Sequence, residues 1–222
     1  MEKSSHSQGS ASSFEADSQD RHLQSKLRAI SMTDSARAGT TVLALLMGLT
    51  ILGISANTLR VYEETHVSRE FMLPLWPDDF NIRPTLALVV GSAIVLVANA
   101  VGIIFNHIGN LRAKSAAAHT SATFLAPLAG LAGALVAVAF YYVADRSEAT
   151  DTFVSWTCRW RDVPMTQAPR WGDLCRQSLA GLYLAVALVP VEVVALALAA
   201  FQTKVERYTD RYLGARKTPV LP

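Results

Sequence analysis

Glu192 is the residue of this chain whose type and position could do chemistry inside a membrane. It lies two positions after Pro190, near the middle of a long apolar run. An ionised carboxylate at the centre of a bilayer costs ~2.5 kcal/mol or more, so the group should be protonated, paired or turned into a helix bundle. Such a residue could carry a proton or a cation. It could also clamp two helices together or contact another subunit.

Asn99 is the best partner that the sequence offers to Glu192. The two residues lie 15 and 14 positions past the beginnings of their apolar runs, at Pro84 and Ser178. If both runs are helices that point in the same direction, a rise of 1.5 Å per residue brings the side chains to within a turn in depth. The spacing predicts a hydrogen bond between the two helices. We favour the structural role for Glu192, because transport usually needs a relay of charges or repeated halves, and the sequence shows neither.

Cys158 and Cys175 are the only cysteines, and both fall between the third and the fourth apolar run. In an extracytosolic loop they should form a disulfide, whereas a cytosolic loop would keep two free thiols. Closing a loop of 17 positions should stabilise it by ~3 kcal/mol in the chain-entropy estimate. Two cysteines with no histidine in the same loop make a poor zinc site, so we expect no metal.

Other residues offer little catalytic chemistry. The chain has no glycine-rich phosphate loop, His-Glu-x-x-His stretch, nucleophile elbow or Cys-x-x-Cys pair. His107 and His119 flank a short loop, where solvated histidines are the simpler interpretation. We therefore expect neither an enzyme nor a cofactor. The formal net charge of +2, spread over several loops, disfavours nucleic acid as a partner.

Four apolar runs must position these residues, and each is long enough to cross a bilayer, which takes ~20 helical residues. With 51% hydrophobic residues in 222, a soluble protein would need several helices that are apolar on every side. The predicted fold class is an all-α membrane protein, a bundle of four transmembrane helices with a small disulfide-capped outer loop. The spans are expected at about residues 40–58, 84–105, 122–144 and 178–201.

The chain divides into a disordered cytoplasmic N-tail (1–37), a transmembrane domain (38–205) and a basic cytoplasmic C-tail (206–222). Residues 1–20 are polar and rich in serine, a composition typical of disorder. At the other end the fourth helix can continue past the membrane, with a basic stripe at helical spacing that could lie against lipid headgroups. The stripe consists of Lys204, Arg207 and Arg211.

The charges of the loops favour a cytoplasmic location for both termini. The second loop and the C-tail are net positive, whereas the first loop is net negative and the third is balanced. All the tryptophans then lie on the outer side, where their rings could sit at the membrane interface or pack a cap. These are Trp76, Trp156, Trp160 and Trp171.

Small residues recur four apart in the third span, and such rows let helix backbones approach closely in lipid. They predict a tight bundle, and they could also form a dimer face. The two rows are Ala126, Gly130 and Ala134, and Ala129, Gly133 and Ala137.

The order of tails, spans and loops resembles that of the MARVEL-type four-helix membrane proteins. The shared features are a cytoplasmic N-tail, four spans, a very short inner loop, the only cysteine pair in the second outer loop, and a basic C-tail. The likeness covers residues 38–205 and rests on this layout. Claudin-like proteins differ, since they carry two cysteines in the first outer loop, and tetraspanins have a Cys-Cys-Gly run where Cys158 is followed by Arg159. The resemblance implies membrane apposition, organisation of lipid domains or vesicle traffic, without catalysis.

We therefore expect a noncatalytic scaffold in the plasma membrane or an endomembrane. Its partners would be membrane lipids together with copies of itself or other membrane proteins. The alternative is an accessory subunit or small transporter in which Glu192 contacts a partner helix or moves a cation.

Overall fold

The computed structural model describes residues 8–66, 75–107, 116–145 and 150–217, and side chains mainly within 31–66, 75–105, 124–144 and 150–205. These residues form four long helices and a short one, with no strand among them beyond a single parallel bridge between Phe80 and Asp151. The helices are α1 (Gln8–Thr65), α2 (Arg83–His107), α4 (Ala116–Asp145), α5 (Phe153–Arg159) and α6 (Trp171–Lys217).

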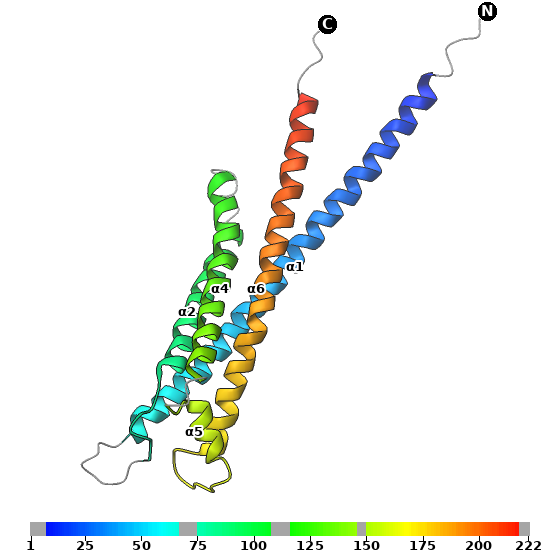
Figure 1. Cartoon of the computed structure of the whole chain (residues 1–222). Coiled ribbons are helices and arrows are strands. Elements are labelled where there is room, and N and C mark those ends of the chain that lie inside the picture. The colour runs from blue at the N-terminus through cyan, green and yellow to red at the C-terminus, as the bar shows by residue number, and fades with distance from the viewer. Residues whose placement is uncertain (1–7, 67–74, 108–115, 146–149, 218–222) are drawn as a thin grey trace, which may run out of the picture.

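The four long helices form a ring in which α2 contacts α1 and α4, and α6 also contacts α1 and α4. Successive helices run in opposite directions, so α2 and α6 are parallel to each other (Figure 1). The N-terminal part of α1 and the C-terminal part of α6 extend beyond α2 and α4 at one end of the bundle, and α5 lies at the other end (Figure 1).

Each long helix contains a stretch that is long and apolar enough to cross a membrane. Large apolar side chains such as Val97, Val136 and Tyr183 point away from the bundle and are more than half exposed. A surface of this kind suits hydrocarbon as the solvent. The predicted fold class is confirmed as a four-helix membrane layout with one disulfide, and its spans lie within Ser31–Thr65, Arg83–Phe105, Phe124–Ala144 and Trp171–Val205.

The first and last helices begin earlier than the spans that the sequence predicts. The helix α1 begins at Gln8, ahead of the predicted start of the first span at residue 40, and its backbone is continuous into that span. No proline occurs before Pro74, so nothing removes a backbone donor along α1. Hydropathy locates the apolar span within a helix, but it does not show where the helix begins or ends. In the same way α6 begins at Trp171, before the predicted start of its span at residue 178, and continues to Lys217.

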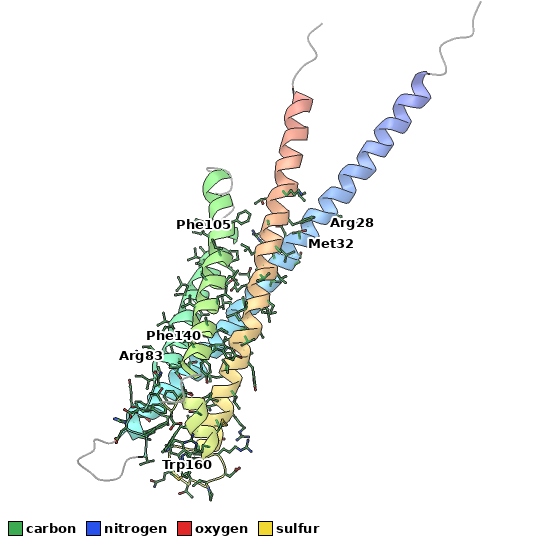
Figure 2. The ribbon with its side chains drawn as sticks, in the orientation of Figure 1. Arg28, Met32, Arg83, Phe105, Phe140 and Trp160 are labelled. Carbon is green, nitrogen blue, oxygen red and sulfur yellow. A yellow bond between two sulfur atoms is a disulfide. The ribbon has the colours of Figure 1, made fainter. Side chains whose placement is uncertain are left out.

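Two clusters of buried apolar side chains hold the chain together. The bundle core consists mainly of small and aliphatic residues from all four long helices, among them Ala44, Val95, Ala134 and Leu188. The second cluster lies in what we call the cap, residues 75–82 and 150–175. Figure 2 shows the cap end of the bundle, with Trp160 at its tip and Arg83 and Phe140 just within the helices.

Candidate functional site

The predicted contact between Asn99 and Glu192 is present. Asn99 Nδ2 donates a hydrogen bond of 2.8 Å to Glu192 Oε1 and a second one of 3.0 Å to the carbonyl oxygen of Val95. Both residues are buried, with exposed fractions of 2% for Asn99 and 0% for Glu192. Because α2 and α6 both run away from the cap, the nearly equal distances of 15 and 14 positions along their apolar runs, from Pro84 and Ser178, bring these side chains to one depth.

Gly130 of α4 forms the third side of this contact. A Cβ atom placed on Gly130 would lie 2.6 Å from Glu192 Oε1 and 2.8 Å from Glu192 Cδ. Any other residue would require the carboxyl group to move, so the missing side chain leaves room for Glu192 in the position that it occupies against α4. The sequence places Gly130 in a packing row but does not predict this role. The sequence does contain a signal for this contact. Gly130 lies 14 positions from Ala144, the outer end of its predicted span, and so at about the same depth in the membrane as Asn99 and Glu192.

The carboxyl group of Glu192 is held on one side only. Its Oε1 atom accepts from Asn99, whereas Oε2 is buried and has no hydrogen-bond partner within the described part of the chain. Among the described residues, no group of three His, Cys, Asp or Glu could hold a metal ion. The arrangement can act chemically as an interhelical hydrogen bond, and its Oε2 atom is open to a further polar partner or a proton.

The rows of small residues in α4 divide between the bundle interior and its surface. Gly130, Gly133 and Ala134 are buried, and Ala126 is half-buried. Ala129 is exposed, whereas the other two members of its row, Gly133 and Ala137, are buried. Within the described part of one chain, Ala129 therefore packs against no other helix, and its role at a face between copies stays a prediction.

Gly91 of α2 is a packing residue that the sequence rows missed. A Cβ atom on Gly91 would lie 2.7 Å from Ala137 Cβ and 2.8 Å from the carbonyl oxygen of Gly133. The backbones of α2 and α4 therefore touch at this point. Gly91 was missed because its partners lie on another helix, and its own helix shows no matching glycine four positions away.

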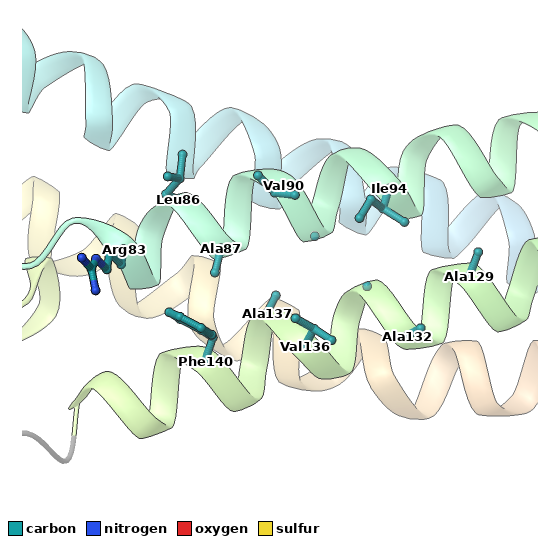
Figure 3. A pocket seen from close by; sticks show the side chains of 12 residues that line it. Arg83, Leu86, Ala87, Val90, Ile94, Ala129, Ala132, Val136, Ala137 and Phe140 are labelled. Carbon is teal, nitrogen blue, oxygen red and sulfur yellow. The ribbon is translucent and has the colours of Figure 1, made fainter.

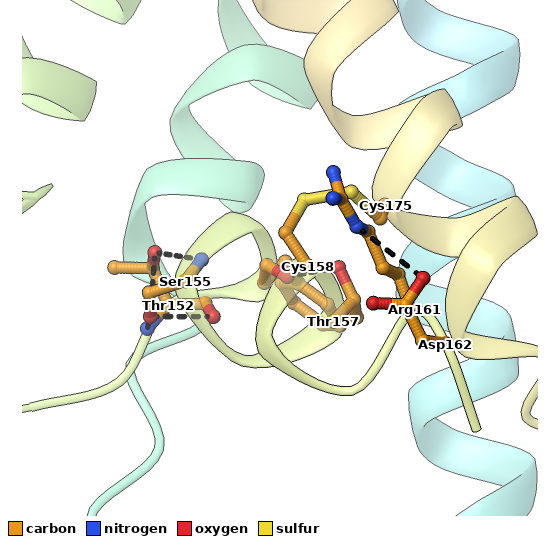
Figure 4. Close-up of a disulfide and its surroundings, with 8 residues drawn as sticks. Thr152, Ser155, Thr157, Cys158, Arg161, Asp162 and Cys175 are labelled. Carbon is orange, nitrogen blue, oxygen red and sulfur yellow. Dashed lines mark hydrogen bonds and ion pairs between the residues drawn. A yellow bond between two sulfur atoms is a disulfide. The ribbon is translucent and has the colours of Figure 1, made fainter.

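The predicted disulfide between Cys158 and Cys175 is confirmed, with a Cα–Cα distance of 4.8 Å (Figure 4). It joins α5 to the first turns of α6. The start of α5 is fixed by Thr152, whose hydroxyl accepts from the backbone N–H of Ser155, while the Ser155 hydroxyl accepts from the backbone N–H of Thr152. Reciprocal bonds of this kind satisfy two donors that a helix otherwise leaves free at its N-terminus.

Trp76 occupies the centre of the cap. It is 3% exposed, and its Nε1–H donates to Thr65 Oγ1 at 3.0 Å. Four aromatic rings from different segments surround it within 5.0–5.6 Å between centroids, namely Tyr62, Phe80, Phe153 and Trp171. Of the two roles that the sequence left open for the tryptophans, packing a cap is the one that Trp76 and Trp171 fill.

The two loops of the cap are also joined through their backbones. The N–H of Asn81, which precedes α2, donates to the carbonyl oxygen of Asp151 at 2.9 Å. The disulfide, the aromatic cluster and this bond together tie α1, α2, α5 and α6 into one unit.

The expected headgroup stripe is described only at its beginning. Lys204 is exposed on α6. The side chains of Arg207 and Arg211, like those of His107 and His119, lie outside the described residues. The stripe remains a prediction.

Comparisons with known proteins give no relative from which a role could be transferred. No family model matches the chain, and neither a curated protein nor a solved structure matches it.

Proposed function

We propose that this protein is a noncatalytic integral membrane scaffold that organises a membrane patch, with a MARVEL-like layout. The observation that supports this most is the buried contact of Glu192 with Asn99 and Gly130. A transport site must exchange with water during its cycle, whereas a clamp that holds three helices together can stay dry. Glu192 lines neither the groove between α2 and α4 nor the small cavity beneath the cap.

The cap is the surface on which an extracytosolic partner would dock. It is fixed by a disulfide, which fits an oxidising compartment, and it exposes Trp160 and Val163. The N-terminal part of α1 and the C-terminal part of α6 both extend from the opposite end of the bundle, where they diverge (Figure 1). Together with the basic inner loop and C-tail, this supports cytoplasmic termini in a plasma membrane or an endomembrane. Lipids and further copies of the chain or other membrane proteins are the proposed partners.

The alternative is an accessory subunit or small transporter that uses Glu192. One observation favours it: Glu192 Oε2 lacks a hydrogen-bond partner among the described residues. A buried polar atom without a partner costs ~1–3 kcal/mol of stability. A proton, a cation or a polar group of a partner helix that bonds to Oε2 would recover this cost.

The variant Glu192→Gln separates the two functions, because glutamine retains an oxygen for Asn99 and cannot carry a charge. Cation and proton flux is measured in sealed proteoliposomes, and complex size on native gels after extraction in mild detergent. The scaffold predicts no flux above protein-free liposomes for either protein. Flux that is lost in the variant at unchanged complex size would reject the scaffold, and loss of clustering without a change in flux would reject transport.

A matched control is Thr50→Val. Thr50 is exposed on α1, and its hydroxyl donates to the carbonyl oxygen of Leu46 in the same helix. This variant also removes a polar group from a span, but it leaves the contacts between helices intact. It should match the wild type in both assays.

A further inference from the structure

An apolar groove runs along the outside of the bundle between α2 and α4 (Figure 3). Its volume is about 660 Å³. The floor forms where Gly91 and Gly133 bring the two backbones together. Larger apolar side chains, all of them substantially exposed, stand along the two sides, namely Leu86, Val90, Ile94, Val136 and Phe140.

The groove is as long as one leaflet of a bilayer. On α2 it extends from Arg83 to Ile94. At 1.5 Å per residue this distance is ~16 Å, about half of a ~30 Å hydrocarbon core. Because Arg83 is the first residue of α2, the groove begins at the cap end of the span. An occupant that lies along it would therefore belong to the cap-side leaflet.

Arg83 is the only charged residue among those that line the groove, and it lies at the mouth, opposite Phe140 (Figure 3). It is exposed, and its guanidinium makes no ion pair within the described part of the chain. Its backbone N–H is held by Asn81 Oδ1 at 3.1 Å, which fixes the start of the helix. A guanidinium binds the oxygens of a phosphate in a two-pronged geometry, and at the membrane interface it attracts lipid headgroups.

We propose that the groove binds one acyl chain of a phospholipid of the cap-side leaflet, with the lipid phosphate on Arg83. The apolar walls match the chain, the length matches a single leaflet, and the one cation sits where the headgroup would be. A transmembrane helix from a second copy would run the full thickness of the membrane and would not need a cation at one end. The site goes beyond the scaffold role, because a bound lipid requires no self-association.

Native mass spectrometry of the purified full-length chain, titrated with phosphatidylglycerol in mild detergent, tests the proposal. Arg83→Gln removes the cation, and Ala132→Phe fills the groove from an exposed lining position. Each variant should bind the lipid about tenfold more weakly, the loss expected for one charge-assisted contact or a blocked site. Thermal melting should be unchanged, since neither side chain is buried in the bundle.

Ala139→Phe is the matched control, because Ala139 is exposed on the same helix and does not line the groove. It should bind phosphatidylglycerol like the wild type. Equal binding by all four proteins would overturn the proposal. The phosphate contact would be overturned if Ala132→Phe alone bound phosphatidylglycerol more weakly and the wild type bound diacylglycerol, which lacks a phosphate, as tightly as phosphatidylglycerol. A smaller complex for Ala132→Phe at unchanged lipid binding would assign the groove to a partner helix. The lipid-binding results are independent of the clustering and flux assays of Glu192→Gln.

Discussion

Gly130 of α4 and Glu192 of α6 lie in direct contact, so that a Cβ atom on the glycine would come within 2.6 Å of the carboxyl oxygen that Asn99 binds. The hydrogen bond between α2 and α6 therefore depends on a third helix that has no side chain at this point. Replacing the glycine tests this dependence without touching either polar residue.

Gly130→Ala should lower the free energy of unfolding by about 1–3 kcal/mol, the usual effect of inserting a methyl group into a packed interior. The carboxyl group must move, and in moving it strains or breaks its bond to Asn99. Thermal unfolding in detergent, followed by circular dichroism, measures the change.

Two controls accompany Gly130→Ala. Gly53→Ala in α1 should have little effect, because a Cβ atom there meets nothing within 4 Å. In a Glu192→Ala background the methyl group at position 130 has room, and Gly130→Ala should then be nearly neutral. Equal destabilisation in both backgrounds would show that the glycine serves something other than the carboxyl group.

The disulfide between Cys158 and Cys175 should stabilise the cap by ~3 kcal/mol, given a separation of 17 positions. Replacing both cysteines by serine removes it without leaving a free thiol. We predict a lower melting temperature for the double variant, and a similar drop when the wild type is reduced. Reductant should not affect the variant. A wild type that melts at the same temperature with and without reductant would contradict the prediction.

Trp76→Ala should destabilise the cap by about 3–5 kcal/mol, because it removes a large buried ring that touches four others. Trp160→Ala is the matched control, since Trp160 is 43% exposed and, among the described residues, lies against one other ring, that of Trp156. Its effect should stay within about 1 kcal/mol. The two variants can be compared by limited proteolysis of the loops and by thermal melting. Equal sensitivity would mean that the aromatic cluster does not hold the cap.

The parts of this structure that the sequence predicts are those that depend on hydropathy and on counting. A span needs a fixed number of apolar residues, so four runs predict four helices. The rise per residue is also constant, which is why the depths of Asn99 and Glu192 could be compared before their helices were placed. The pairing of Cys158 with Cys175 followed because no other cysteine competes.

What could not be predicted depends on how each helix is rotated about its axis. Ala129 and Gly133 are four positions apart in one row, yet Gly133 is buried against α2 and Ala129 lines an open groove. The role of Gly91 and the groove itself arise only once α2 and α4 are in contact. The ring of Tyr62, which belongs to α1, joins the cap cluster for the same reason.

The measurement that tests the account most directly is a double-mutant cycle between Asn99 and Glu192. Asn99→Leu, Glu192→Leu and the double variant are unfolded in detergent beside the wild type. If the pair is the clamp that holds the bundle, the double variant will be less destabilised than the sum of the single ones, with a coupling of about 1 kcal/mol. Additive effects, with no coupling beyond experimental error, would contradict a structural role for Glu192.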